Sequence, residues 1–260
     1  MATPLCQNNV SLRTLITTNH GICDLGLFYQ VHWESSAYSH ASVTDSTVLV
    51  SWSNVSLTSL EVDFIANNAA TGGVAKDTFG NTTTPSTPSA NGRSTTTTAS
   101  INFFYTVTAL NPFYGIVQET IGADAVEAKD LSAGKAVATT SDFIAQKYVR
   151  DSGGDVLGLA VSDGLDTTND VEDLSGTTDF LGVVGEQFIQ EQIFLTNRKT
   201  KISGTVYSSR ATVGQGTTDP GEIDNSFVFA NVTVPEPFSM ILTGCGLLGF
   251  SLLRRRASRS

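Results

Sequence analysis

Charged residues are scarce in this sequence: they make up 15% of the chain, well below the roughly 25% of an average globular protein. Histidine and cysteine are also rare, with three of each. His20, His32 and His40 all lie in the first 40 residues. A nucleophilic enzyme needs a base beside its nucleophile, and neither G-x-S-x-G nor H-E-x-x-H occurs. The sequence therefore predicts a protein that is not an enzyme, with structural or surface positions for its histidines.

Positive charge is especially scarce outside the C-terminal tail. The whole chain has 15 basic and 25 acidic residues, whereas residues 1–234 have 11 and 24, a net charge of −13. Such a body repels phosphate backbones, so nucleic acid is excluded as an expected partner. Ser, Thr, Asn and Gly are plentiful instead, as is common in extracellular β-proteins.

The C-terminal tail combines three features in a fixed order. A Pro-Glu-Pro motif at 235–237 precedes an uncharged apolar run, 238–253, which ends at an arginine cluster, 254–256. As a helix the run would rise about 24 Å, and flanking arginines can extend it toward the ~30 Å of a bilayer core by snorkelling. The run has no polar face, which disfavours a buried core helix. We expect a transmembrane helix with its arginines on the cytoplasmic side.

This layout resembles the PEP-CTERM sorting signal, over residues 234–260. The processing motif and the membrane-anchor arginines are Pro235, Glu236, Pro237, Arg254, Arg255 and Arg256. The resemblance implies export by a Gram-negative bacterium that makes exopolysaccharide, with exosortase as the partner that cleaves at Pro-Glu-Pro. It also implies a precursor anchored in the inner membrane and a product at the cell surface or in the extracellular matrix. Residues 11–28 are similar to the mature N-termini of such proteins, without their common Gly-Asp-Lys-x-Phe sequence.

Residues 1–9 show none of the three regions of a signal peptide. Export then requires either that a leader was removed or that the true start lies upstream of Met1; a plain tail anchor without export is the remaining alternative. In an oxidising compartment Cys6 and Cys23 would close a loop worth roughly 3 kcal/mol. Unpaired thiols are the alternative, and we expect the disulfide because the tail indicates export.

Alternating apolar residues predict that residues 1–233 form one all-β body, a β-sandwich with jelly-roll or Greek-key connections. The predicted strands are 25–33, 48–52, 60–65, 101–108, 114–120, 143–150, 157–161, 188–196, 202–207 and 227–232. A short helix is an alternative for 188–196 and a second helical candidate lies at 126–131.

Two segments interrupt the alternation. Residues 81–100 carry a single charge, Arg93, and predict a flexible loop, with an O-glycosylated stretch as the alternative. Residues 151–179 are acidic and contain glycine, which predicts a surface loop with few apolar contacts. Its carboxylates are either calcium ligands or solvated turn residues, and no other cofactor is expected. The calcium candidates are Asp163, Asp166, Asp170 and Asp173.

These observations predict a non-enzymatic structural or adhesive protein of the cell surface or exopolysaccharide matrix. The rival hypothesis is a carbohydrate-binding module. Its candidate sugar-stacking residues, for which core positions are the alternative, are Trp33, Trp52, Tyr38 and Tyr114. A hydrolase is the third class, and it would need two close carboxylates in a cleft, which nothing in the sequence pairs.

Overall fold

The computed structural model describes residues 3–130, 141–150, 156–166, 171–179 and 185–232. The chain is mostly β-strand, so the all-β class predicted from the sequence is confirmed. Among the described residues, no helix has the length and apolar character needed to cross a membrane. The Pro-Glu-Pro motif, the apolar run 238–253 and the arginine cluster lie outside the described residues.

In the part of the chain that the structure describes, fourteen strands follow one another after a short N-terminal segment. They are β1 (Val10–Ser11), β2 (Ile22–Leu25), β3 (Tyr29–Ser39), β4 (Val48–Ser53), β5 (Ser59–Ala66), β6 (Phe79–Gly80), β7 (Ser94–Ala109), β8 (Tyr114–Asp130), β9 (Ser141–Arg150), β10 (Val156–Asp166), β11 (Val171–Asp179), β12 (Glu186–Ile202), β13 (Thr205–Val213) and β14 (Glu222–Asn231). One α-helix, α1 (Leu12–Thr17), and one 3-10 turn, η1 (Thr18–Gly21), lie between β1 and β2.

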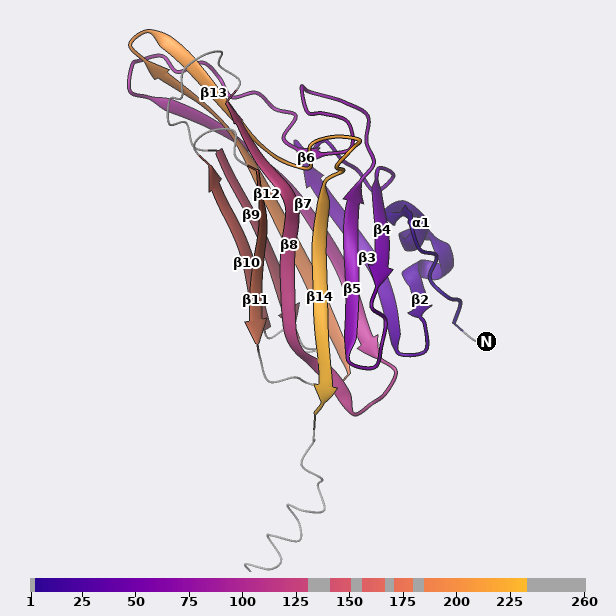
Figure 1. Ribbon diagram of the computed structural model, residues 1–260. Coiled ribbons are helices and arrows are strands. Elements are labelled where there is room, and N and C mark those ends of the chain that lie inside the picture. Colours follow the sequence, from indigo (N-terminus) through magenta and orange to yellow (C-terminus); the bar gives the residue numbers. More distant parts are fainter. Residues whose placement is uncertain (1–2, 131–140, 151–155, 167–170, 180–184, 233–260) are drawn as a thin grey trace, which may run out of the picture.

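The strands are arranged in two facing layers (Figure 1). One layer contains β4, β5, β14, β8 and β11, and the other contains β2, β3, β7, β12, β9 and β10. Strand β13 pairs with both β12 and β8, and so it joins the layers into one hydrogen-bonded path. The path curls into a half-barrel. The named strand pairs that the structure describes, such as β12 with β7 and β14 with β8, are antiparallel.

The hydrophobic core lies between the two layers because the strands alternate buried and outward-facing residues. Along β5, Leu60, Val62 and Phe64 are fully buried, whereas the residues between them are not. Phe64 stacks on Phe103 of the opposite layer, with ring centroids 4.0 Å apart. Tyr29 of β3 likewise contacts Phe229 of β14, at 4.4 Å. Aromatic pairs of this kind contribute about 0.5–1.5 kcal/mol beyond the area they bury.

The N-terminal segment closes one side of the half-barrel. Helix α1 contacts β3 of one layer and β4 of the other. It is capped by Ser11, whose hydroxyl accepts a hydrogen bond from the Thr14 N–H, and it buries Leu12 and Leu15. The sequence analysis did not predict this helix, although a capping serine before apolar residues at i and i+3 was its signal.

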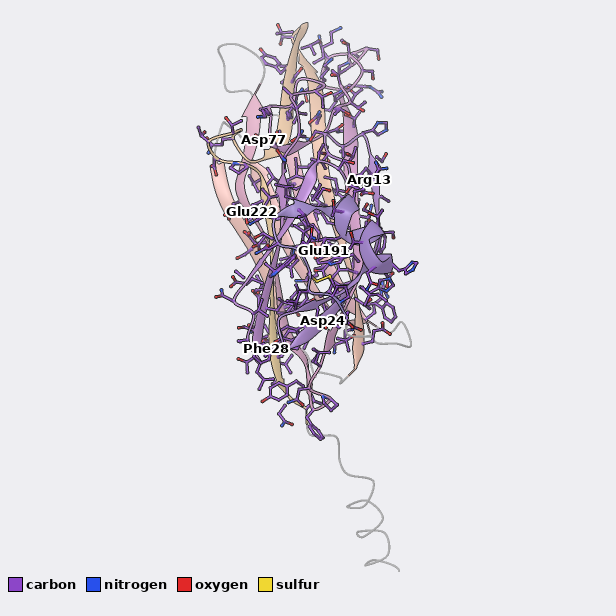
Figure 2. All side chains as sticks on the ribbon, turned by 90° about the vertical axis from the view of Figure 1, so that its right-hand side faces the viewer. Arg13, Asp24, Phe28, Asp77, Glu191 and Glu222 are labelled. Carbon is purple, nitrogen blue, oxygen red and sulfur yellow. A yellow bond between two sulfur atoms is a disulfide. The ribbon has the colours of Figure 1, made fainter. Side chains whose placement is uncertain are left out.

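Cys6 and Cys23 form a disulfide, with Cα atoms 4.9 Å apart (Figure 2). The bond ties the segment before β1 to edge strand β2. Backbone hydrogen bonds reinforce this attachment, since the Cys6 N–H donates to the Asp24 carbonyl at 2.9 Å. The two cysteines are 17 positions apart in the sequence, so the cross-link is worth roughly 3 kcal/mol in the chain-entropy account.

Three local predictions are wrong. Residues 25–33 form parts of two strands, with a turn at Gly26 (φ 62°) between β2 and β3. Residues 202–207 contain a hairpin turn, Ser203-Gly204, in which both residues have positive φ. The helix considered at 126–131 is replaced by β8, which continues as strand to Asp130. Pairing with β13 stabilises that extension, so tertiary context overrides the local pattern.

The strand predicted at 188–196 is confirmed, since these residues lie within β12; the alternative of a short helix there is wrong.

The acidic segment 151–179 was predicted as a surface loop that contains a strand at 157–161. The strand is confirmed as part of β10, whereas the loop prediction is wrong for the rest of β10 and for β11. Its described residues form β10 and β11, which pair with β9 and β8. The frequent aspartates and glycines favoured a loop, but from Gly158 to Asp166 the backbone pairs residue by residue with β9. Strand β10 pairs with β9, which precedes it, and β11 pairs with the more distant β8; composition cannot reveal these partners.

The polar segment 81–100 is ordered as well, against the prediction of a flexible loop. Its last seven residues begin β7 and pair with β12. Asn81 is fully buried, and its side-chain amide donates to the carbonyls of Thr97 (2.8 Å) and Leu195 (3.3 Å). The Asn197 amide donates to the carbonyls of Asn81 and Thr83, both at 3.0 Å. Buried hydrogen bonds thus order a segment that has little apolar surface to bury.

Replacing Asn81 by Ala should lower the free energy of unfolding by about 1–3 kcal/mol, because buried carbonyl partners lose their donor. Urea denaturation followed by tryptophan fluorescence measures this change. Asn67→Ala is the matched control, since the Asn67 side chain is exposed. Equal stability of the two variants would show that the Asn81 hydrogen bonds do not hold the segment.

Candidate functional site

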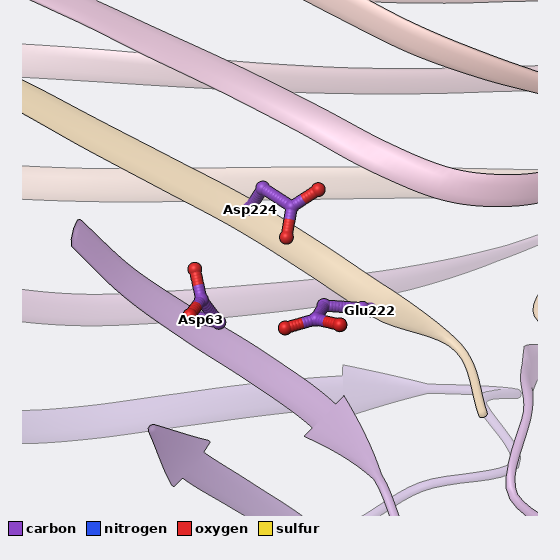
Figure 3. Close-up of side chains that lie close together, drawn as sticks. All are labelled: Asp63, Glu222 and Asp224. Carbon is purple, nitrogen blue, oxygen red and sulfur yellow. The ribbon is translucent and has the colours of Figure 1, made fainter. Parts of the chain in front are cut away.

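An acidic cleft lies on the outer face of the layer that contains β5, β14 and β8. Period-2 alternation sends Asp63 outward on β5, and Glu222 and Asp224 outward on β14. The register places Asp224 directly opposite Asp63. Figure 3 shows the three carboxylates facing one another across the two strands. One oxygen of each lies within 4.8 Å of the others.

Strand β8 supplies the other side of the cleft. Asp124 lies opposite Glu222, and Gly122 lies opposite Asp224. Because Gly122 has no side chain, the surface is hollowed beside Asp224; a Cβ there would come within 3.1 Å of the Leu174 carbonyl on β11. The cleft has a volume of about 400 Å³. Its lining comprises Glu61, Asp63, Thr120, Gly122, Asp124, Leu174, Ser175, Asp224, Asn225 and Ser226.

Crowding of like charges perturbs the titration of this cleft. Partial burial, followed by repulsion from Glu222 and Glu61, raises the pKa of Asp63 to about 7. Burial and the nearby carboxylates, Asp124 first, raise the pKa of Asp224 to about 8. The pKa of Glu222 is raised by burial and by Asp124. At neutral pH the cleft therefore retains protons that isolated carboxylates would lose.

Two kinds of ligand would relieve this repulsion. A hard cation such as calcium takes oxygen ligands, of which Asp63, Glu222 and Asp224 can each offer one. Hydroxyl groups of a sugar can donate hydrogen bonds to the same oxygens, and Thr120 and Ser226 add hydroxyls along the wall. The cleft also meets the geometric condition set for a hydrolase, two close carboxylates in a hollow.

The sequence-predicted aromatic site does not form a row. Trp33 is 1% exposed and lies in the core beside Phe64 and Tyr105. Trp52, Tyr38 and Tyr114 are half-buried, on β4, β3 and β8, and pack against the core. Such positions leave little ring surface for stacking on a sugar.

The remaining candidates are not among the residues that line the cleft, or cannot be placed. His20 and His40 are exposed, and His32 is half-buried on β3. Among the calcium candidates, Asp163 and Asp166 lie on β10 and Asp173 on β11, in strands rather than in the predicted loop. Asp170, like the tail motif, lies outside the described residues.

Sequence reasoning missed the acidic cleft. Asp63 and Asp224 are 161 positions apart, and the strand register brings them together. Each does occupy an outward position of an alternating strand, Glu61-Val62-Asp63 on β5 and Glu222-Ile223-Asp224 on β14. Acidic residues repeated at this period were the available signal, but alternation alone does not say which strands are neighbours.

The sequence matches no protein-family model and no curated protein. Three solved structures are similar in part. The enzymatically active domain of bacteriophage CBA120 tailspike protein 4 shares 12% identity over 75% of this chain and 19% of that chain, with a TM-score of 0.23. An arabinose-bound α-L-arabinofuranosidase, MgGH51, shares 9% sequence identity over 68% of this chain and 22% of that chain, with a TM-score of 0.21. The α-xylosidase of Xanthomonas citri shares 9% sequence identity over 52% of this chain and 12% of that chain, with a TM-score of 0.17. The chain spans less than a quarter of each, and at these TM-scores the likenesses carry no argument.

The raised carboxylate pKa values predict a pH dependence of stability. Between the ordinary aspartate pKa of about 4 and the folded values of about 7 and 8, the folded protein binds more protons than the unfolded chain. The free energy of unfolding should therefore fall as the pH rises through this window. Differential scanning fluorimetry should show a falling Tm and a flatter profile for Asp224→Asn.

Glu186→Gln is the control for this experiment, because Glu186 is an exposed carboxylate on another strand. Its profile should follow that of the unmodified protein. If Asp224→Asn leaves the profile unchanged, repulsion in the cleft does not contribute to the pH dependence.

Proposed function

We propose that this chain is an exported, non-enzymatic structural or adhesive protein of a bacterial cell surface or exopolysaccharide matrix. The observation that carries the proposal is the Cys6–Cys23 disulfide, because such bonds persist in oxidising compartments outside the cytoplasm. The long antiparallel strands and the low content of charged residues support the same assignment.

In this proposal the C-terminal tail directs export and processing of the protein. Residues 234–260 act as a PEP-CTERM-like signal: the apolar run holds a precursor in the inner membrane, and exosortase cleaves at Pro235-Glu236-Pro237. The two facing layers then serve as the exported body, in the manner of a β-sandwich with jelly-roll or Greek-key connections. Exopolysaccharide is the proposed partner of the released protein.

Replacing Pro-Glu-Pro at 235–237 by three alanines should block maturation and leave the body folded, since the motif follows β14 in the sequence and contributes to none of the described strands. In a host that carries an exosortase, a heavier, membrane-retained form should accumulate, as seen by fractionation and immunoblotting. A matched triple-alanine variant at 232–234 should still be processed. Normal processing of the 235–237 variant would rule out the sorting assignment.

A carbohydrate-binding module is the second candidate, and the acidic cleft favours it. The cleft offers carboxylate and hydroxyl oxygens along a 400 Å³ hollow. Its negative charge favours neutral or cationic sugars; a polymer of uronic acids would need a bridging divalent cation. Calcium would then be a shared ligand of protein and polysaccharide.

Isothermal titration calorimetry with neutral and uronic-acid polysaccharides, with and without calcium, tests this candidate. We expect binding to fall at least about tenfold in Asp63→Asn/Asp224→Asn and to persist in Glu186→Gln, because a charged hydrogen bond contributes roughly 1.5–3 kcal/mol. Equal affinity of both variants would exclude the cleft. Release of reducing ends from any polysaccharide would instead support the hydrolase class.

A further inference from the structure

Three reactive side chains lie in the core between the layers, on the face of β14 opposite the acidic cleft. Lys147 on β9 and Glu191 on β12 are both fully buried, and the two residues lie directly opposite each other in the strand register. Asn225, on β14 of the facing layer, is 1% exposed. Figure 2 shows Glu191 about midway along the long axis of the molecule. An amine, a carboxyl and a carboxamide are thus enclosed in one core.

The Asn225 carboxamide is held by Glu191. Its Nδ2 donates to Glu191 Oε2 at 3.2 Å, and the other Glu191 oxygen accepts from the hydroxyl of Tyr105. The Asn225 Oδ1 is buried and has no hydrogen-bond partner in the described part of the chain. Buried carbonyl oxygens are rarely left in this state. The amide carbon therefore lies in a dry site with an acid at its nitrogen and an unengaged oxygen.

The Lys147 amine crosses the core to the same stretch of β14. Its Nζ donates to the Thr120 carbonyl at 2.9 Å, and Thr120 pairs with Ser226, the neighbour of Asn225. The same nitrogen lies 3.7 Å from the ring centroid of Phe227, which shares the inward face of β14 with Asn225. These two contacts place the amine beside the segment that carries the carboxamide.

We propose that Lys147 and Asn225 form an intramolecular isopeptide bond between the two layers, with Glu191 as the catalytic carboxyl. The Lys147 nitrogen attacks Cγ of Asn225, so that a new C–N bond forms and the Cγ–Nδ2 bond breaks. Glu191 protonates the departing nitrogen and accepts a proton from the attacking amine. One ammonia molecule leaves, and Glu191 ends in the protonation state in which it began.

The burial of the site supplies the protonation states that this reaction needs. Desolvation lowers the pKa of Lys147 to about 8, although Glu191 and Glu119 oppose the shift. Desolvation raises the pKa of Glu191 to about 7, against the effect of Lys147 and of its hydrogen bonds. A neutral amine and a protonated carboxyl are therefore both accessible near neutral pH. Tyr105, whose pKa burial raises well above its usual value, remains a donor to Glu191.

An isopeptide bond would give the body a second cross-link, far from the disulfide. The disulfide fixes the N-terminal segment to edge strand β2, whereas the new bond would join β9 of one layer to β14 of the other. It would also convert a costly buried charge into a neutral amide. The bond goes beyond the proposed surface role and does not depend on it.

Intact-mass spectrometry of the full chain, reduced and shown to be folded by circular dichroism, tests the proposal. The expected mass lies below that calculated from the sequence by one ammonia. Protease digestion should yield a branched peptide that contains both Lys147 and Asn225, which distinguishes the bond from ammonia loss elsewhere. A folded chain of full calculated mass overturns the proposal and leaves a non-covalent network. Loss of one water instead of ammonia overturns the assignment to Asn225, because it indicates a bond to a carboxyl group.

Variants separate the roles of the three residues. Lys147→Arg and Asn225→Ala should show the full calculated mass and no branched peptide that joins positions 147 and 225. Glu191→Gln should retain the full mass for hours after folding, because its amide cannot shuttle the proton. Glu186→Gln, on the same strand but exposed, should cross-link as the unmodified chain does. Complete cross-linking of Glu191→Gln would overturn the catalytic role of Glu191.

Discussion

Strand β14 is hydrogen-bonded to β5 on one side and to β8 on the other, and this double pairing sets the positions on which the rest of the structure depends. One face of β14 carries Ile223, Asn225 and Phe227 into the core. The other face carries Asp224 into the acidic cleft and Glu222 beside it. A one-residue slip of register would exchange these faces and put carboxylates into the core. The fold therefore specifies this register strongly.

Charged side chains on the two faces of β14 are stabilised in different ways. In the cleft, carboxylates lie opposite one another and remain partly solvated, so repulsion is moderated by water and by retained protons. In the core, Lys147 and Glu191 have no access to solvent, and each must be compensated by contacts within the protein. Thr120, Phe227, Tyr105 and Asn225 supply those contacts. An open cleft suits exchange with a ligand, whereas a closed core suits a permanent arrangement.

Polar groups also order much of the rest of the body. Asn81 and Asn197 fix the polar segment after β6 through buried amide hydrogen bonds. Ser11 caps the helix that closes one side of the half-barrel. These devices compensate for a sequence rich in Ser, Thr and Asn, in which apolar burial alone would leave long segments unattached. The low content of charged residues and the ordered polar segments agree with the extracellular role that we propose.

The sequence by itself determined the all-β class and most strands, because the alternation along β4, β5 and β7 is local and strong. It also determined the candidate cysteine pair and the tail motif, since both can be identified from residue type and spacing. Only the tertiary structure decided that the polar segment 81–100 begins β7 and that the acidic segment 151–179 contains β11, because the pairing partners of both strands lie far along the chain. The same reason applies to both clusters on β14. Asp63 lies opposite Asp224, and Glu191 lies opposite Lys147 and accepts a hydrogen bond from Asn225, through strand order and register, and these are properties of the folded sheet that no single strand encodes.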